Sequence, residues 1–164
     1  MADSGLVMYE EEFKLIDVEL SKLHEQANAK LTLLVDKNGQ LITSVGDTKG
    51  VDTTSLASLT AGNVAATGGM AKLLGEREFS VLFHEGEKDN IHISIIGQRV
   101  ILVVIFDRRS SLGLVRLRAK KTSDVLVKIF DQIFLKIEQE RGTKPLAKSP
   151  FAEITEEDIE KLFG

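Results

Sequence analysis

Histidine is the first residue type in this sequence whose spacing could support chemistry. His84 and His92 lie on either side of a predicted turn at 86–89, so their imidazoles could face each other across a hairpin. Two imidazoles without a carboxylate at ligand spacing make a poor metal site. We therefore expect structural or surface histidines here, and we assign no metal ligand and no cofactor.

The sequence contains no recognisable motif for a catalytic nucleophile or for nucleotide binding. The chain has no cysteine, which excludes thiol catalysis and Cys-ligated zinc. No serine lies in a recognisable nucleophile elbow. The glycine-rich segment 46–50 lacks the GxxxxGK[ST] pattern of a P-loop. We therefore assign no catalytic residue and expect that the chain is not an enzyme.

A basic run occupies the region 108–121. In a protein that activates a GTPase, Arg108 or Arg109 could act as an arginine finger, which contributes about 10³–10⁵ in rate. A solvated helix face that steers an acidic partner is the simpler interpretation of the same charges. The members of the run are Arg108, Arg109, Arg116, Arg118, Lys120 and Lys121.

Composition narrows the class of protein. The 164 residues fit one domain, or one domain with a tail. The net charge of −4 and the absence of tryptophan argue against a nucleic-acid partner. No segment is apolar enough to span a bilayer, and the N-terminus lacks a signal-peptide pattern. We expect a cytoplasmic protein that does not insert into membranes.

Hydrophobic periodicity predicts the elements that must position any site. Residues 100–106 are apolar without alternation, which predicts an inner strand covered on both faces. The whole pattern indicates an α/β sandwich around a five-stranded, mainly antiparallel sheet with helices on both faces. The predicted helices are 9–28, 53–74 and 111–141, and the predicted strands are 31–35, 40–45, 79–85, 91–96 and 100–106. The candidate N-caps of the second helix are Asp52, Thr53 and Thr54. The apolar stripe of the third helix consists of Leu112, Val115, Ala119, Leu126, Ile129, Ile133 and Ile137.

The second predicted helix is unusual because it contains three internal glycines, each costing about 1 kcal/mol relative to alanine. Ala61, Ala65 and Gly69 are four residues apart and form a ridge of small residues. This ridge could pack on the chain's own sheet, or it could be a docking surface for a second subunit or another protein. The lack of charge over 53–71 favours docking. The larger residues expected to hold the opposite side to the sheet are Leu56, Leu59, Val64, Met70 and Leu73.

The C-terminal part of the sequence reads as a separate recognition element. We divide the chain into a domain at 1–141, a linker at 142–150 that holds both prolines, and a short helix at 151–164. A peptide of this length is marginal as a free helix, so we expect it to order on binding. Its apolar recognition residues are Phe151, Ile154, Ile159, Leu162 and Phe163.

The α-β-β-α-β-β-β-α order with an alanine- and glycine-rich second helix resembles the roadblock family. The sequence closely resembles a bacterial member that is the homodimeric activating protein of a small Ras-like GTPase. The segments that carry this resemblance are LVMYEEEF (6–13), LVDKNGQLI (34–42), DTTSLASLTAGNVAA (52–66), FHEG (83–86), ILVVIFD (101–107), SSLGLVRLR (110–118) and SPFAEITEEDI (149–159).

The resemblance implies a roadblock fold and a homodimer joined at sheet edges, with the two second helices side by side. It implies that one GTPase binds across both second helices. GTP hydrolysis would rise because the GTPase switch region is reshaped, without an arginine finger. The C-terminal segment would contact the GTPase elsewhere and tune binding or exchange. On matching positions, Ala65 and Gly69 belong to the GTPase-facing surface of this helix. The full set of predicted GTPase-facing residues is Ala61, Gly62, Ala65, Gly68, Gly69 and Lys72.

The resemblance also suggests a role in bacterial cell polarity or gliding motility, with localisation at a cell pole. A roadblock scaffold that recruits a GTPase to a larger complex without stimulating it is the alternative. A small-ligand sensor or an enzyme fits less well, because convergent polar groups and titratable residues are few.

Overall fold

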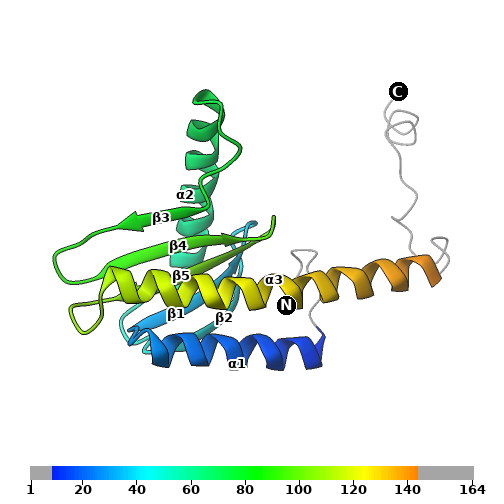
Figure 1. The fold of residues 1–164 in the computed structure, drawn as a ribbon, viewed down its shortest axis with the longest axis horizontal. Helices are drawn as coiled ribbons and strands as arrows, with labels where there is room; N and C mark the ends of the chain where they lie inside the picture. Colours follow the sequence, from blue (N-terminus) through cyan, green and yellow to red (C-terminus); the bar gives the residue numbers. More distant parts are fainter. Residues whose placement is uncertain (1–8, 144–164) are drawn as a thin grey trace.

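A five-stranded sheet lies between two helical layers in the computed structural model, which describes residues 9–143 (Figure 1). The helices α1 and α3 cover one face, and α2 packs on the other. This arrangement confirms the predicted element order and fold class. The elements are α1 (Glu10–Gln26), β1 (Leu31–Asp36), β2 (Leu41–Gly46), α2 (Thr53–Leu73), β3 (Val81–His84), β4 (Asn90–Ile96), β5 (Val100–Phe106) and α3 (Leu112–Thr143).

The sheet has the strand order β2-β1-β5-β4-β3, and every neighbouring pair is antiparallel. The prediction of a mainly antiparallel sheet is therefore confirmed. All seven residues of β5 are buried at the centre of the sheet, as the unbroken apolar run predicted. The edge strands are β2 and β3, which leaves one side of each without a strand partner in the described part of the chain.

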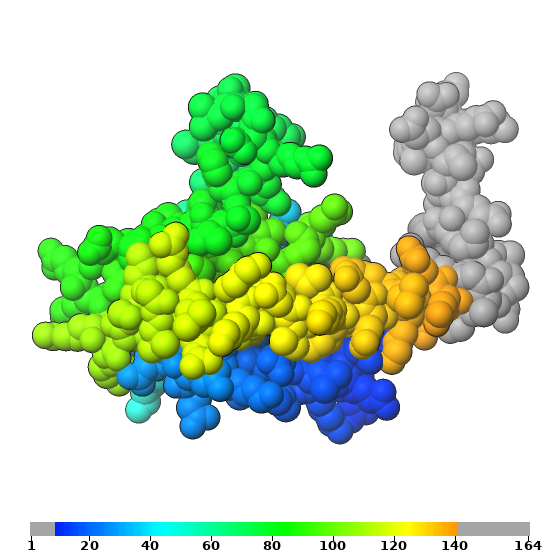
Figure 2. Space-filling model, in the orientation of Figure 1, coloured from blue at the N-terminus to red at the C-terminus, as the bar shows by residue number. Residues whose placement is uncertain are grey.

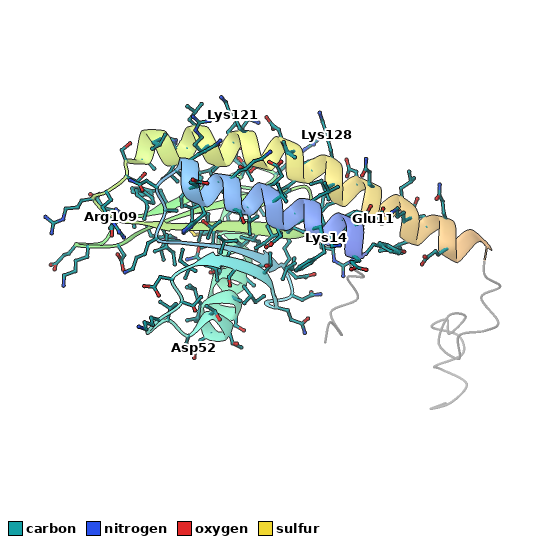
Figure 3. All side chains as sticks on the ribbon, turned by 90° about the horizontal axis from the view of Figure 1, so that it is seen from below. Glu11, Lys14, Asp52, Arg109, Lys121 and Lys128 are labelled. Carbon is teal, nitrogen blue, oxygen red and sulfur yellow. The ribbon has the colours of Figure 1, made fainter. Side chains whose placement is uncertain are left out.

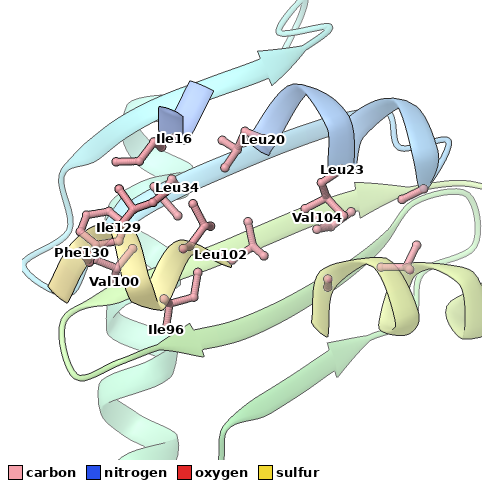
Figure 4. Packing of buried hydrophobic residues seen from close by; sticks show 14 of the residues in the cluster. Ile16, Leu20, Leu23, Leu34, Ile96, Val100, Leu102, Val104, Ile129 and Phe130 are labelled. Carbon is pink, nitrogen blue, oxygen red and sulfur yellow. The ribbon is translucent and has the colours of Figure 1, made fainter. Parts of the chain in front are cut away.

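The larger core lies between the sheet and the α1–α3 layer (Figure 4). Leu20 of α1, Leu34 of β1, Leu102 of β5 and Ile133 of α3 meet there with no exposed surface. Burying each such side chain contributes about 1.5–3 kcal/mol. The predicted apolar stripe of α3 is confirmed because Val115, Ala119, Leu126, Ile129 and Ile133 are all buried.

A second core lies between the sheet and α2, and it uses small residues on the helix side. Ala57 and Val64 of α2 pack against Leu33 of β1 and Ile101 of β5. Alternate residues of β1 and β5 therefore serve the two cores in turn, as the pleat of a strand requires. The small side chains bring the α2 backbone close to the sheet.

Several predicted boundaries differ from the observed ones by one or two residues. The strand predicted at 79–85 is only Val81–His84 in the structure. Helix α3 continues to Thr143, two residues into the predicted linker. The rest of that linker and the predicted recognition helix at 151–164 lie outside the described residues. No helix within 9–143 combines the length and apolar character that crossing a membrane requires.

Candidate partner-binding surface on helix α2

Helix α2 begins at a well-formed cap. The Asp52 Oδ1 atom accepts a hydrogen bond from the Ser55 backbone N–H at 3.0 Å, and the Ser55 hydroxyl donates to Oδ2 at 2.6 Å. The hydrogen bonds from Ser55 lower the pKa of the Asp52 carboxyl. The helix ends before Gly75, whose φ of +78° suits the left-handed residue that follows a helix. Of the three predicted capping candidates, the structure selects Asp52.

The C-terminal half of α2 extends beyond the sheet and projects from the body of the molecule (Figures 1 and 2). The N-terminal half packs on the sheet through Ala57, Thr60, Ala61 and Val64, which follow the helical repeat of three and four. Beyond Val64 the sheet provides no layer for the helix to cover. Most residues after this point are exposed or half-buried as a result.

The prediction that the large apolar side chains of α2 face the sheet is wrong for three of the five residues. Leu59 is 71% exposed, Met70 is 57% exposed and Leu73 is 88% exposed. Of the five predicted residues, Val64 is buried and Leu56 is partly buried in the second core. The physical reason is that the helix seats itself with alanines, which turns its large side chains outward. We call Leu59, Met70 and Leu73 the α2 apolar stripe.

The glycines of α2 are not explained by packing within the chain. A Cβ atom added at Gly62, Gly68 or Gly69 would find no atom within 4 Å beyond the neighbouring helix backbone. The interpretation that the ridge of Ala61, Ala65 and Gly69 packs on its own sheet is therefore wrong for Gly69. It is correct for Ala61, which is 8% exposed and belongs to the second core. Ala65 is exposed.

The structure brings most of the predicted GTPase-facing residues together at one hollow of about 310 Å³. Ala61 and Ala65 line it, with Gly68, Gly69 and Lys72 on the same helix. Gly62 is exposed but is not part of the lining. We call these six residues the α2 ridge.

The hollow also has charged lining residues that the sequence pattern did not indicate. Lys37 from the β1–β2 turn lines it together with Arg77 and Glu78 from the segment after α2. The Lys37 Nζ atom lies 2.9 Å from Glu78 Oε1. This pair joins segments 41 residues apart, so only the fold places it beside the ridge. The surface therefore combines an uncharged helix flank with a charged margin.

A second exposed apolar feature is the edge strand β3. Val81 is 45% exposed and Phe83 is 39% exposed, and both side chains lie on the α3 side of the sheet. The Phe83 ring stacks on Phe106 with 6.1 Å between centroids. An apolar edge strand offers unpaired backbone groups to another strand. It is thus a further surface suited to a protein partner.

The two candidate histidines do not face each other. In the β3–β4 register, His84 pairs with Ile91 and His92 pairs with Phe83, which places the imidazoles on opposite faces of the sheet. His84 lies 3.3 Å from the Asn63 side chain of α2, whereas His92 is buried towards α3. Within residues 9–143 no group of three potential metal ligands comes together.

The basic run is partly neutralised by nearby carboxylates. Arg109 Nη2 lies 3.0 Å from Asp107 Oδ2, and this hydrogen-bonded pair raises the pKa of Arg109 and lowers that of Asp107. Lys120 Nζ lies 3.2 Å from Asp124 Oδ1. The run belongs to α3 and the loop before it, and α3 covers the sheet face opposite α2. It is therefore not part of the α2 ridge.

Comparison with known proteins identifies relatives of the whole described fold. The family model for the Roadblock/LC7 domain matches residues 15–106. The structure of Myxococcus xanthus MglB is 65% identical, with a TM-score of 0.74, over 78% of this chain and 96% of that one. The gliding protein MglB of Thermus thermophilus is 32% identical, with a TM-score of 0.74, over 78% and 97% of the two chains.

A third structure, described as MglB with a tetrameric arrangement, is 30% identical with a TM-score of 0.74. It matches 79% of this chain and 97% of its own. A Roadblock/LC7 domain from Streptomyces avermitilis, at 14% identity and a TM-score of 0.61, shares the fold. The comparison with curated proteins gives no match.

Proposed function

The chain belongs to the Roadblock/LC7 family, and from this membership we propose that it is a homodimeric regulator of a small Ras-like GTPase of the MglA type. In this proposal it stimulates GTP hydrolysis and acts in bacterial cell polarity or gliding motility. The name of the Thermus relative, a gliding protein, supports the motility role. We place the protein in the cytoplasm, with concentration at a cell pole.

The observation that carries this proposal is the open ridge of α2. Gly62, Gly68 and Gly69 each weaken the helix by about 1 kcal/mol, yet nothing in the described part of the chain occupies the space beside them. Small residues let a partner backbone approach closely, so the ridge is shaped for a contact between proteins. Lys72 at its C-terminal end supplies a cation for an acidic group of the partner. We assign the α2 ridge to the GTPase.

The proposed mechanism uses position rather than a catalytic side chain. No arginine belongs to the α2 ridge, and Arg108 and Arg109 precede α3, the helix on the opposite sheet face. Arg77 does line the hollow beside the ridge, so the absence of an arginine finger in this proposal rests on the family resemblance. Docking would instead fix the switch region so that the GTPase's own groups orient the attacking water and stabilise the developing charge.

Self-association has its own surfaces in this proposal. The α2 apolar stripe lies on the flank next to the ridge, because the helical repeat of about 3.6 residues turns Leu59, Met70 and Leu73 away from most of the ridge positions. We assign this stripe and the β3 edge to a second copy of the chain. Pairing at β3 would bury Val81 and Phe83 and satisfy the free edge. The MglB relative with a tetrameric arrangement supports self-association.

The C-terminal segment is assigned a separate role in tuning GTPase binding or nucleotide exchange. Its five large apolar residues suit the helix-in-groove mode of recognition. Deletion of residues 149–164 is expected to leave the dimer intact in analytical ultracentrifugation and to change GTPase affinity or exchange rate. A deletion that alters neither quantity would remove this assignment.

The experiment that separates an activator from a scaffold is single-turnover GTP hydrolysis by the partner GTPase, with and without the full chain. An activator raises the hydrolysis rate constant as its concentration increases until the GTPase is saturated. The alternative, a scaffold that recruits the GTPase to a larger complex, predicts binding with an unchanged rate constant. Measured binding without stimulation would replace our proposal with the scaffold.

A further inference from the structure

A second hollow of about 280 Å³ lies between α3 and the β3–β4 edge of the sheet. It is on the sheet face opposite the α2 ridge, so it is separate from the proposed GTPase surface. Its lining also includes Ser80 and Val81, which lie at the β3 edge that we assign to a second copy of the chain. His92 and Ser94 of β4 form one wall, and Arg116, Lys120 and Ser123 of α3 form the other. The three α3 residues recur at steps of four and three, which places them on one face of the helix.

Buried polar atoms without partners are concentrated at this hollow. His92 is 2% exposed and Ser94 is 7% exposed, yet His92 Nδ1 and Ser94 Oγ have no hydrogen-bond partner in the described part of the chain. The buried hydroxyl of Ser123 also lacks a partner there, although a helical serine ordinarily bonds to a carbonyl one turn earlier. Such atoms are rare in folded proteins and are costly unless something binds to them.

The charge of the hollow is positive. Arg116 and Lys120 line it, and no carboxylate is among its lining residues within the described part of the chain. Asp124, one turn beyond Lys120, forms an ion pair with that lysine and compensates one of the two cations. Burial, with a smaller effect of Arg116, lowers the pKa of His92, so its imidazole is neutral at pH 7 and still has one N–H to donate.

We propose that this hollow is a binding site for a small phosphate oxyanion, either inorganic phosphate or the phosphate group of a small monoester. Arg116, Lys120 and Ser123 approach from the α3 wall and His92 and Ser94 from the β4 wall, and phosphate offers several acceptor oxygens in different directions. A planar carboxylate would engage fewer of these donors. The volume is just below the range of about 300–1,000 Å³ for drug-sized ligands, which favours a small ligand.

Isothermal titration of the full chain without any GTPase tests this site. Inorganic phosphate and methyl phosphate are titrated separately, with sodium chloride and sodium acetate at matched ionic strength as references. Saturable binding of either phosphate, absent for chloride and acetate, is the expected result. Binding of both probes assigns the site to phosphate esters in general, and binding of inorganic phosphate alone assigns it to the free ion.

Two variants tie the signal to the hollow. Arg116→Gln removes a charge-assisted hydrogen bond and is expected to raise the dissociation constant at least about tenfold. Ser94→Ala tests the opposite wall and is expected to weaken binding as well. Lys121→Gln, on the same helix but outside the lining (Figure 3), is the matched control and should leave the constant unchanged.

Three results would overturn the proposal. They are no saturable phosphate binding beyond the chloride reference, equal binding of acetate, and equal weakening by Arg116→Gln and Lys121→Gln. Because the assay contains no GTPase and the variants lie on the face opposite α2, its failure would leave the proposed regulatory function untouched.

Discussion

Lys136 of α3 donates a 2.8 Å hydrogen bond from Nζ to Oε2 of Glu12 in α1, joining residues 124 positions apart. Glu12 is 4% exposed, and the same ammonium group lies 5.3 Å from the centroid of the Tyr9 ring. The hydrogen bond with Glu12 raises the pKa of Lys136. A single charged contact thus connects the start of the described chain to the last third of α3.

We predict that Lys136→Met lowers the thermal unfolding midpoint, because it leaves a buried carboxylate without its cation. Lys14→Met is the matched control, since Lys14 (Figure 3) pairs with Glu10 at 3.6 Å with both side chains exposed. An exposed pair of this kind contributes little to stability. Equal midpoints for the two variants in differential scanning calorimetry would show that the Glu12–Lys136 contact does not stabilise the α1–α3 layer.

Ala57→Leu is expected to destabilise the protein by disrupting the packing of α2 on the sheet. Ala57 has no exposed surface and packs against the centre of the sheet, so a larger side chain there costs about 1–3 kcal/mol of unfolding free energy. Ala66→Leu adds the same side chain at an exposed position of the helix and should stay within about 0.5 kcal/mol of wild type. Urea denaturation measures both variants. An Ala57→Leu protein as stable as Ala66→Leu would contradict the close seating of α2.

Stability should fall with acidification because of buried histidine. Burial lowers the pKa of His92 below the value of about 6.5 that the unfolded chain has, so the unfolded state binds more protons between these two pKa values. The free energy of unfolding therefore decreases as the pH falls below about 6.5, by at most about 1.4 kcal/mol per pH unit for each such group. His24, whose pKa burial also lowers, adds to the effect.

His92→Gln is expected to flatten this pH dependence, and His84→Gln, at an exposed position of β3, is its matched control. Urea unfolding at several pH values between about 7.5 and about 5, on either side of the ordinary histidine pKa, provides the measurement. The slope should be smaller for His92→Gln than for wild type and His84→Gln. If the free energy of unfolding has the same slope against pH in wild type, His92→Gln and His84→Gln, then His92 does not contribute to the pH dependence of stability.

Arg108→Ala should leave stimulated GTP hydrolysis within a few-fold of wild type. The α2 ridge contains no arginine, and Arg108 lies in the loop before α3. A true arginine finger contributes about 10³–10⁵ in rate, so the two outcomes are easily distinguished. A loss of about 10³ or more in single-turnover assays would assign the catalytic group to this chain and exclude a mechanism by positioning alone.

The sequence predicted the fold well where periodicity and capping agree. The unbroken apolar run of β5, the Asp52 cap and the α3 stripe all correspond to what the structure shows. The orientation of α2 was harder to predict, because its apolar residues surround the helix and give it no dominant face. Long-range placement, such as Lys37 beside Glu78, depends on the strand order and could not be read from spacing.

In the candidate site, too, the sequence pattern predicted some features, whereas others depend on the assembled fold. Small residues at steps of four indicated the ridge, and in the structure Ala61, Ala65 and Gly69 line one hollow. The burial of Ala61 and the exposure of Leu59 depend on which flank of α2 faces the sheet, and the exposure of Leu73 depends on where the sheet ends beneath the helix. The seating of α2 and the extent of the sheet beneath it are properties of the assembled fold rather than of any local sequence pattern. The role of the ridge in binding a GTPase stays a prediction.

The most direct test of the proposed function compares two equivalent substitutions in single-turnover GTP hydrolysis by the partner GTPase. Gly69→Arg places a large charged side chain in the open space beside the ridge, and Gly113→Arg does the same at an exposed position near the start of α3. A Cβ atom at either position meets no atom in the described part of the chain, so circular dichroism should show both proteins folded. We predict that Gly69→Arg, like Ala65→Arg, returns hydrolysis to the rate of the GTPase alone, whereas Gly113→Arg stimulates as wild type does. Full stimulation by Gly69→Arg and Ala65→Arg would contradict the assignment of the α2 ridge to the GTPase.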